Sequence, residues 1–458
     1  MIHTHTPLTD LNFVIRTFGC QMNKHDAERI AGTLEGLGAL MVTEIEDADI
    51  VVFMTCCVRE AADVRLYGQV ASIKNIPLRE GSPLAKRIIA VGGCIGQRDG
   101  EKLVQELPHL DIVFGTHNLS SLPKLLEAVL DGDKHQVEVL ESSEEFSTEL
   151  PSDREHFWAA WLPITVGCDN FCTYCVVPYV RGRERSRRIE SIADEAARYV
   201  ADGVQEITLL GQNVNSYGRD LYGKPRFADV LDCVDASGIS RLRFATSHPK
   251  DLSDEVIEKF SSLRSLMPAL HLPVQSGSNE ILRRMNRRYT VEHYLDLIDK
   301  VRLQNPDIAF STDIIVGFPG ETEEDFMATY RLVEEVGYTQ VFSFIYSKRA
   351  GTPAAKMQDD TPHEVIQDRF ERLVDLIQDK AYEANQADKG RDIDVLVEGL
   401  SKRDKNLLAG KSPKNQMVHM PLKPGMSVDE VVGKIIPVHI DEVKTWYLKG
   451  QIIPGEIS

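Results

Sequence analysis

The sequence predicts an α/β protein in three parts: an amino-terminal open parallel α/β sheet, a central partial (βα)6 barrel and a small carboxy-terminal β-barrel. Three observations indicate this division. Short apolar runs alternate with helical periods over residues 11–132, a second alternation of strands and helices occupies 157–389, and five short β-like runs fill 390–453. The acidic, Ser-rich and aperiodic segment 133–156 is expected to be a linker.

In the amino-terminal part, three apolar runs read as parallel strands: Phe13–Thr17, Ile50–Met54 and Ile88–Val91. Helical periods follow them, beginning near Asp26, Arg59 and Asp99. One cysteine comes soon after each strand: Cys20, Cys56 and Cys94. Because ligands of such sheets bind outside the carboxyl ends of the strands, we expect the three thiols to meet at one rim.

Three thiolates could hold a cubane iron–sulfur cluster and leave one iron without a protein ligand. Zinc with an exchangeable fourth ligand is the alternative, and three buried cysteines that act as small hydrophobic residues are the structural alternative. Spacing alone does not decide whether Cys56 or its neighbour Cys57 is the ligand.

A second set of thiols follows a short apolar run, Leu162–Val166, that reads as the first barrel strand. Cys168, Cys172 and Cys175 form a C-x-x-x-C-x-x-C loop with no fourth Cys or His close behind. A structural zinc or iron–sulfur site normally has that fourth ligand. The spacing therefore predicts a cluster with one iron open to a small molecule, against the alternatives of a zinc loop or unrelated thiols.

Five further runs complete the six strands of the predicted partial barrel: Glu206–Leu210, Arg241–Ala245, Ala269–Leu272, Ala309–Val316 and Gln340–Tyr346. Six βα units are too few for a closed eight-stranded barrel, so one side is expected to be open. Polar residues and glycine collect where these strands end, which is the active-site end of a βα barrel, although any one of them could be a loop cap or turn former. They are Gly211, Gln212, Asn213, Thr246, Ser247, His248, Gln275, Ser276, Gly317, Tyr346 and Ser347.

The composition is that of a soluble globular protein, with 42% hydrophobic and 27% charged residues. No signal segment or membrane-spanning run is apparent, and most cysteines lie in motifs, which favours a reducing cytoplasm. A formal charge of −18 argues that any nucleic acid is contacted locally. One candidate contact is the run of arginines after the cysteine loop, which could hold phosphate or a carboxylate; a solvated face with scattered ion pairs is the alternative. The run consists of Arg181, Arg183, Arg185, Arg187 and Arg188.

The last part of the chain has five β-like runs: Ile393–Leu400, Leu407–Gly410, Gln416–Met420, Val431–Ile440 and Tyr447–Ile453. They suggest a small OB-like barrel of the kind that binds oligonucleotides. A solubilising tail domain is the alternative. Five basic residues in its connecting loops could follow a phosphate backbone: Lys402, Arg403, Lys405, Lys411 and Lys414.

The loop of Cys168, Cys172 and Cys175 resembles the signature of radical S-adenosylmethionine (SAM) enzymes. The strings TFGCQMNKHDAER, TCCVREAAD and GGCIGQRDGEKL resemble the amino-terminal domain of the methylthiotransferase branch, whose motif aligns its cysteine with Cys56. Met54 stands where that family commonly has Asn. The carboxy-terminal segment resembles a TRAM domain. The resemblance implies two [4Fe-4S] clusters, an auxiliary one on Cys20, Cys56 and Cys94 and one that binds SAM.

The resemblance also implies SAM contacts. LLGQNVNSYG occupies the position that holds the SAM amino group, which makes Gln212 and Asn213 candidates. The segments around Gln275, Ser276 and Gly317 resemble those that contact ribose and adenine. Arg183, in the arginine run, is a further candidate for the cofactor.

Within the family, TFGCQMN, the VRE triplet and LLGQNVNSY most resemble the bacterial branch that methylthiolates carbon 2 of N(6)-dimethylallyladenosine next to the anticodon of tRNA. This implies radical sulfur insertion, SAM-dependent methyl transfer, the tRNA anticodon stem-loop as partner and a reductant such as a flavodoxin-like protein. We expect a cytoplasmic monomer; the sulfur donor is not indicated. The alternatives are a methylthiotransferase for threonylcarbamoyladenosine or a ribosomal protein aspartate, and a non-catalytic iron–sulfur RNA-binding module.

Overall fold

The computed structural model describes residues 8–57, 60–141, 151–423 and 425–454. It divides into two compact units. The first contains the chain up to residue 155, Val166–Asp169 and Cys175–Glu184; the second contains His156–Thr165, Asn170–Tyr174 and the chain from Arg185 onward. Within the described ranges, no helix is both long enough and apolar enough to cross a membrane.

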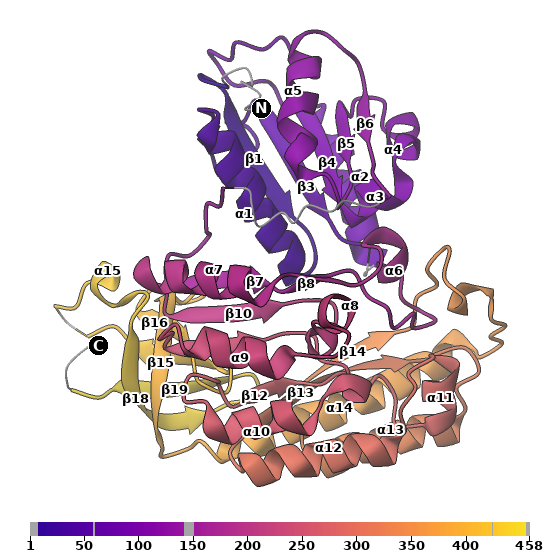
Figure 1. Ribbon diagram of the computed structural model, residues 1–458, viewed down its shortest axis with the longest axis vertical. Coiled ribbons are helices and arrows are strands. Elements are labelled where there is room, and N and C mark those ends of the chain that lie inside the picture. Colours follow the sequence, from indigo (N-terminus) through magenta and orange to yellow (C-terminus); the bar gives the residue numbers. More distant parts are fainter. Residues whose placement is uncertain (1–7, 58–59, 142–150, 424, 455–458) are drawn as a thin grey trace. The chain divides into compact units, whose positions relative to one another are not determined.

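A six-stranded parallel sheet forms the centre of the first unit (Figure 1). Its order is β2-β1-β3-β4-β5-β6, with β1 (Asn12–Thr17), β2 (Leu40–Met41), β3 (Ile50–Thr55), β4 (Ile88–Gly93), β5 (Ile112–Phe114) and β6 (Gln136–Glu138). The three predicted strands are confirmed. Strand β6 lies inside the segment that the sequence predicts to be a linker. It was not predicted, because three residues are too few to give a periodic signal.

Helices cover both faces of this sheet, so its central strands are buried throughout. One face packs on α1 (Gln21–Gly36) and α5 (Leu122–Leu130), and the other on α2 (Glu60–Ile73), α3 (Cys94–Asp99), α4 (Glu101–Glu106) and α6 (Val177–Val180). Met54 of β3 is fully buried in the core beneath α1 and α5.

Two helices begin earlier than the periodicity predicts. Helix α1 starts at Gln21, not near Asp26, because its first turns carry buried polar side chains such as Asn23 and His25, which hide the apolar period. Helix α3 starts at Cys94, and a separate helix, α4, follows from Glu101. Cys20 and Cys94 therefore stand at the first turns of helices. The predicted start at Arg59 lies outside the described residues.

The second unit contains the six parallel strands predicted for the partial barrel. They form two three-stranded sheets, β11-β10-β7 and β12-β13-β14, linked by a bridge between Leu242 and Leu266. The strands are β7 (Ala159–Pro163), β10 (Glu206–Leu210), β11 (Arg241–Phe244), β12 (Ala269–His271), β13 (Ala309–Val316) and β14 (Gln340–Ile345). The segment predicted as the first strand, Leu162–Val166, is divided between two strands. It contains the end of β7, which starts earlier than predicted, and the short strand β8 (Thr165–Val166). Between the two, Ile164 N donates to Leu210 O.

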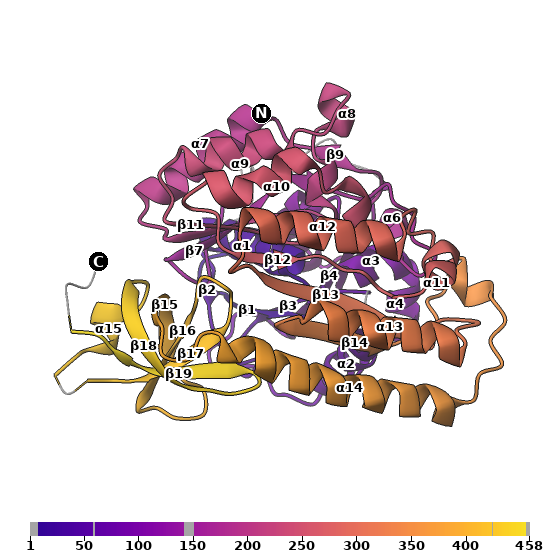
Figure 2. The same cartoon turned by 90° about the horizontal axis from the view of Figure 1, so that it is seen from below.

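Helices lie outside these strands, as Figures 1 and 2 show. They are α7 (Ile189–Ala201), α9 (Phe227–Asp235), α10 (Asp254–Ser262), α12 (Val291–Gln304), α13 (Glu323–Val336) and α14 (His363–Gln386). Shorter helices follow strand ends: α8 (Arg219–Tyr222), α11 (Asn279–Arg284) and the 3-10 turns η3 (Val214–Ser216), η4 (Pro249–Asp251) and η5 (Ala354–Lys356). The loops at the carboxyl ends of the strands are thereby held on a rigid frame.

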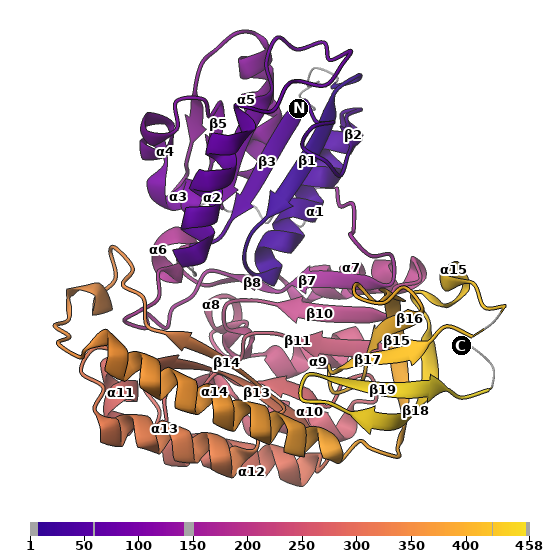
Figure 3. The same cartoon turned by 180° about the vertical axis from the view of Figure 1, so that it is seen from behind.

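The carboxy-terminal strands close into a five-stranded barrel, as the sequence predicts (Figure 3). Its order is β15-β16-β17-β19-β18, with β15 (Asp392–Leu400), β16 (Leu407–Lys411), β17 (Met417–Pro421), β18 (Ile435–Val443) and β19 (Tyr447–Ile452). The predicted strand Val431–Ile440 starts later, because Val428–Val431 form α15 with a Ser427–Glu430 capping box.

Buried polar contacts fix this small barrel to the partial barrel within the second unit. Arg241 donates to the carbonyl oxygens of Lys411 and Asp394, and Arg243 to those of Ser412 and Pro413, at 2.7–2.9 Å. Lys414 pairs with Asp307 and Asp388, each at 2.8 Å. Lys414 is thus held in ion pairs with 11% of its side chain exposed, and Lys411 is half-buried, whereas Lys402, Arg403 and Lys405 are exposed.

Candidate iron–sulfur and cofactor sites

The fold brings Cys20, Cys56 and Cys94 to one edge of the first unit's sheet. Strands β1, β3 and β4 are adjacent and parallel. Cys20 precedes the first residue of α1, Cys56 directly follows β3, and Cys94 is the first residue of α3. The three thiols therefore come from the carboxyl ends of neighbouring strands, as the sequence predicts.

Close backbone approaches hold this edge together. Gly19 has φ +112°, and a Cβ atom there would lie 2.1 Å from Cys56 Cβ, so no larger residue fits. Gly93 has φ +85°, and its Cβ would lie 2.6 Å from the Thr55 carbonyl oxygen. The Thr55 hydroxyl donates to Gly92 O at 2.6 Å and accepts from Ile95 N at 3.1 Å. These contacts fix the residues that flank Cys56 and Cys94.

The four cysteines of this edge form two hydrogen-bonded pairs. A hydrogen bond with Cys56 lowers the pKa of Cys20 to about 6, against the effect of burial. A hydrogen bond with Cys57 lowers the pKa of Cys94 to about 7, and the same bond together with burial raises the pKa of Cys57. Cys20 and Cys94 thus favour the thiolate form that iron requires, whereas Cys57 favours the neutral thiol and packs in the apolar core.

A buried arginine lies beside these thiols. Arg181, only 5% exposed, donates to Asn23 Oδ1 at 2.8 Å and Asp26 Oδ2 at 3.1 Å, and it hydrogen-bonds Cys94. Burial acts to raise the pKa of Asp26, but Arg181 and then His25 outweigh it, so this pKa lies below its usual value. The carboxylate and the guanidinium are therefore both charged.

Within the described residues, no group of three or more His, Cys, Asp or Glu side chains is arranged to bind a single metal ion. The chemistry of the donor set nevertheless fits a cluster: sulfur donors inclined to the thiolate form and a cation in contact with one of them.

The second cysteine loop is held by several parts of the chain. In the first unit, Cys168 N donates to Gly182 O at 3.1 Å, and Val176 and Val180 beyond Cys175 pack in the core of that unit. In the second unit, the segment that contains Cys172 is bonded to the turn after α11, where Thr173 N donates to Met285 O at 3.1 Å.

Cys172 also contacts a buried arginine. Arg287 Nη1 lies 3.5 Å from Cys172 Sγ, while its other nitrogens donate to Tyr289 Oη at 3.0 Å and Pro273 O at 2.7 Å. Arg287 is 5% exposed, and the Tyr289 ring lies 5.2 Å from its guanidinium carbon.

Buried polar atoms without partners collect at the carboxyl ends of the strands in the second unit. Of the buried polar atoms without a hydrogen-bond partner among the described residues, six lie there: Thr165 Oγ1, Asn213 Oδ1, Asn215 Nδ2, Ser247 Oγ, His248 Nε2 and Tyr346 Oη. A buried unpaired polar group costs about 1–3 kcal/mol, so this set indicates a place for a polar ligand. Donors and acceptors are both present, which fits SAM.

His248 is a neutral donor in this set. Burial, and next Arg287 and Lys250, holds its pKa well below the usual value. Because its Nδ1 accepts from Lys250 N at 3.2 Å, its proton lies on the unpaired Nε2. The backbone is strained nearby: Thr246 has φ +69° and Gln275 has φ +73°. Such strain costs about 1–3 kcal/mol and concentrates at functional sites.

The other residues predicted to contact SAM differ in whether their donor and acceptor atoms already have partners in the protein. Asn213 donates to Asp251 at 2.7 Å and keeps its oxygen free, and Gln212 beside it is half-buried. Ser276 lies 3.3 Å from the hydroxyl of Thr329 in α13 and accepts from Ser278 N, so its hydroxyl already has partners within the protein.

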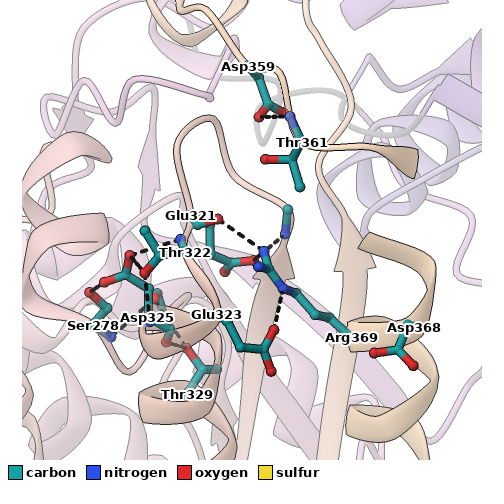
Figure 4. A network of polar contacts seen from close by, with 12 residues as sticks. Ser278, Glu321, Thr322, Glu323, Asp325, Thr329, Asp359, Thr361, Asp368 and Arg369 are labelled. Carbon is teal, nitrogen blue, oxygen red and sulfur yellow. Dashed lines mark hydrogen bonds and ion pairs between the residues drawn. The ribbon is translucent and has the colours of Figure 1, made fainter. Parts of the chain in front are cut away.

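Gly317 N donates to Glu321 Oε2 at 2.8 Å, and Arg369 holds Glu321 through its carbonyl oxygen at 3.0 Å (Figure 4). Burial raises the pKa of Glu321 to about 7. Arg369 also donates to Glu323 at 3.0 Å, so the loop after β13 is tied to α14.

The arginine run is not one exposed patch. Arg181 and Arg187 are buried and paired with Asp26 and Glu195, respectively. Arg183 is exposed and pairs with Asp169 at 2.7 Å. Its contact with a cofactor stays a prediction.

Three family models match the chain. They are an uncharacterized protein family (UPF0004) at residues 12–115, the radical SAM superfamily at 162–333 and the TRAM domain at 386–453. A relative from Carboxydothermus hydrogenoformans, tRNA-2-methylthio-N(6)-dimethylallyladenosine synthase, is 46% identical over 449 residues, which cover 97% of this chain and all of the relative. The chain belongs to this synthase family.

Other synthases agree. That of Acidothermus cellulolyticus is 48% identical over 93% of this chain and 86% of its own, and one from Clostridium botulinum is 46% identical over 96% and 97%. The predicted family and fold class are confirmed.

Solved structures share the fold. The radical SAM methyltransferase TsrM from Kitasatospora setae superposes with a TM-score of 0.54 at 14% identity, over 76% of this chain and 77% of its own. The cobalamin-dependent radical SAM enzyme OxsB gives 0.50 at 14% identity, over 80% and 56%.

Sequence reasoning missed Asp26, Asn215 and Arg287. Asn215 lies in LLGQNVNSYG, and its place just past a predicted strand end was an available signal. Arg287 is one of four arginines in RRMNRR, and nothing in that pattern distinguishes the buried one.

Proposed function

We propose that this chain methylthiolates carbon 2 of N(6)-dimethylallyladenosine next to the anticodon of tRNA, giving 2-methylthio-N(6)-dimethylallyladenosine. The observation that carries this proposal is 46% identity to a synthase of that name over its whole length. The reaction combines radical SAM sulfur insertion with SAM-dependent methyl transfer.

The cofactors are two [4Fe-4S] clusters and SAM. When bound, a reduced cluster supplies the electron that cleaves SAM to methionine and a 5′-deoxyadenosyl radical. We assign Cys168, Cys172 and Cys175 to the cluster that binds SAM, and Cys20, Cys56 and Cys94 to the auxiliary cluster. Support comes from the three sulfurs on neighbouring strand ends and from the buried arginine beside each set.

The proposed SAM site is the set of strand-end residues in the second unit. Asn213 offers its free amide oxygen to the SAM amino group, and Gln212 beside it is half-buried with capacity for a further contact. Gln275 presents a strained backbone, while Ser276 and Gly317 keep their loops in place through the bonds given above. Arg183 is the proposed contact for a carboxylate.

Three further residues complete this site in the proposal. Asn215, Ser247 and His248 are at most 5% exposed, and each has an unpaired polar atom. His248 is neutral, so it serves as a hydrogen-bond donor to the cofactor or the adenine ring and holds no positive charge there. Burial of all three keeps water away from a radical that would otherwise be quenched.

The anticodon stem-loop is the proposed RNA partner, with the small barrel as its docking domain. The exposed Lys402, Arg403 and Lys405 support this assignment. Because carbon 2 must reach the radical, the target adenosine has to leave its stack. We assign the electron supply to a flavodoxin-like reductant and place the chain in the cytoplasm as a monomer. Domain limits of 157–389 and 390–453 belong to the same proposal, whereas the first domain extends beyond the expected limit of 132, because β6 is a strand of its sheet.

One anaerobic experiment tests the function. Reconstituted protein is incubated with a reductant, SAM and tRNA that carries N(6)-dimethylallyladenosine. We expect 5′-deoxyadenosine and, by mass analysis of digested tRNA, 2-methylthio-N(6)-dimethylallyladenosine. Methylthiolation of threonylcarbamoyladenosine instead would contradict the assigned substrate, and absence of 5′-deoxyadenosine would contradict the radical reaction.

A further inference from the structure

Each set of cysteines is contacted by one buried arginine. Arg181 hydrogen-bonds Cys94 in the first unit, and Arg287 lies 3.5 Å from Cys172 Sγ in the second. Both side chains are about 5% exposed. A guanidinium is charged at any pH at which a protein folds, so each site contains a permanent buried cation beside a ligand sulfur.

The two cations differ in what balances their charge. Arg181 forms an ion pair with Asp26, which is itself 3% exposed. Arg287 donates to a tyrosine hydroxyl and to a carbonyl oxygen, both neutral. No carboxylate of the described residues pairs with Arg287. A buried charge without a counter-charge is unfavourable even when its hydrogen bonds are made, so Arg287 would be stabilised by an anion that no described carboxylate provides.

We propose that Arg181 and Arg287 are positioning residues, each of which holds one ligand sulfur of its cluster and raises that cluster's reduction potential, with the larger effect from Arg287. The inference rests on the proposed assignment of the six cysteines. Three thiolates carry more negative charge than an oxidised cubane core neutralises, so each loaded site is the anion that a nearby cation stabilises.

The sign of the effect follows from charge. Reduction adds an electron to an already negative site, and a buried cation stabilises the reduced state more than the oxidised one. A hydrogen bond to the sulfur acts in the same direction. Removal of either arginine should therefore lower the potential of its own cluster. Asp26 partly cancels the field of Arg181, whereas no carboxylate cancels that of Arg287.

The test uses two backgrounds that each hold one cluster. Cys20→Ala/Cys56→Ala/Cys94→Ala leaves the cluster that binds SAM, and Cys168→Ala/Cys172→Ala/Cys175→Ala leaves the auxiliary one. In each background, Arg181→Met, Arg181→Lys, Arg287→Met and Arg287→Lys are reconstituted anaerobically. Iron and sulfide contents are measured first, and midpoint potentials follow from redox titration monitored by electron paramagnetic resonance.

Buried arginines away from the thiols serve as controls. Arg87 precedes β4 at the end opposite Cys94 and donates to carbonyl oxygens such as that of Ala48 at 2.8 Å. Arg241, at the start of β11, likewise donates to carbonyl oxygens only. Arg87→Met and Arg241→Met remove a buried guanidinium from each unit and should leave both potentials unchanged.

We expect Arg287→Met to lower the potential of the SAM-binding cluster, Arg181→Met to lower that of the auxiliary cluster by less, and neither to affect the other cluster. The lysine variants keep the charge and should shift less. If a methionine variant does not fold or take up iron, the lysine variant takes its place in the comparison of midpoint potentials, because it keeps the charge but loses the contact between guanidinium and sulfur. Unchanged potentials at full iron content, or a larger shift from Arg181, would overturn the inference. A background without any cluster would instead overturn the cysteine assignment.

Discussion

The two cysteine sites differ in how completely their polar groups are satisfied. At the carboxyl ends of β1, β3 and β4, Thr55, Asn23 and Asp26 all have partners, and Arg181 has its own carboxylate. At the strand ends of the second unit, buried oxygen and nitrogen atoms have none among the described residues. The first site thus has its polar groups satisfied by the protein itself, as the proposed inorganic cluster requires, whereas the second also has free donors and acceptors for the proposed organic ligand.

The largest expected effects separate the two cysteine sets. Cys168→Ala, Cys172→Ala or Cys175→Ala should abolish SAM cleavage, because each removes a proposed ligand of the cluster that binds SAM. Cys20→Ala, Cys56→Ala or Cys94→Ala should leave cleavage largely intact and abolish sulfur insertion. Quantification of 5′-deoxyadenosine and of methylthiolated nucleoside from the same reactions distinguishes these outcomes. Loss of cleavage in all six variants would show that the division of labour is wrong.

A second test concerns the adjacent cysteines of the auxiliary site. Cys56→Ala should lose the auxiliary cluster, whereas Cys57→Ala should retain it, because Cys57 is a neutral thiol buried in the apolar core. The cost of Cys57→Ala should be about 1–2 kcal/mol of stability. Iron content in the background that lacks Cys168, Cys172 and Cys175 is the measurement. Loss of iron from Cys57→Ala alone would reverse the assignment.

The unsatisfied atoms of the second unit predict a binding effect. Asn213→Ala removes a free acceptor and should weaken SAM binding by about tenfold, the effect of one lost hydrogen bond of about 1.4 kcal/mol. Equilibrium binding of SAM to the reconstituted protein measures it. Asn118→Ala is the matched control, because Asn118 is equally buried but bonds Gly115 and Glu138 in the first unit. Equal weakening by both variants would mean that the effect is not local.

The last prediction concerns stability rather than either cysteine site, and it is a dependence on pH. Burial raises the pKa of Glu321 from 4.5 to about 7, so the folded protein keeps a proton that the unfolded chain releases in this range. The resulting stability is fully present below pH 4.5 and is lost as pH rises through about 7, by at most ~3 kcal/mol.

Thermal unfolding between pH 5 and 8 tests this prediction. Glu321→Gln should flatten the decline in melting temperature, and Glu371→Gln, at an exposed position of α14, should not. A decline in Glu321→Gln as steep as in the unmodified protein would contradict the assigned pKa.

Much of this arrangement could be predicted from the sequence. Cysteines that follow buried strands are placed by the strands, so the meeting of Cys20, Cys56 and Cys94 at one edge of a sheet could be predicted. Their role as cluster ligands stays a prediction. Helix α1 was placed too late, because its buried Asn23, His25 and Asp26 lack an apolar period. Arg181 contacts Asn23, 158 residues away in the sequence, and also Cys94. Arg287 contacts Cys172, 115 residues away. No local sequence pattern encodes such contacts.

Strand β11 and the residues just after it contact the terminal barrel at one end and the strand-end site at the other. Its arginines at 241 and 243 fasten the terminal barrel, and the chain just beyond it presents Ser247 and His248. An RNA bound by that barrel would thus lie at a fixed distance from Ser247 and His248. The number of base pairs between the bound part of the RNA and the target adenosine would then contribute to substrate selection, in addition to the bases in the loop.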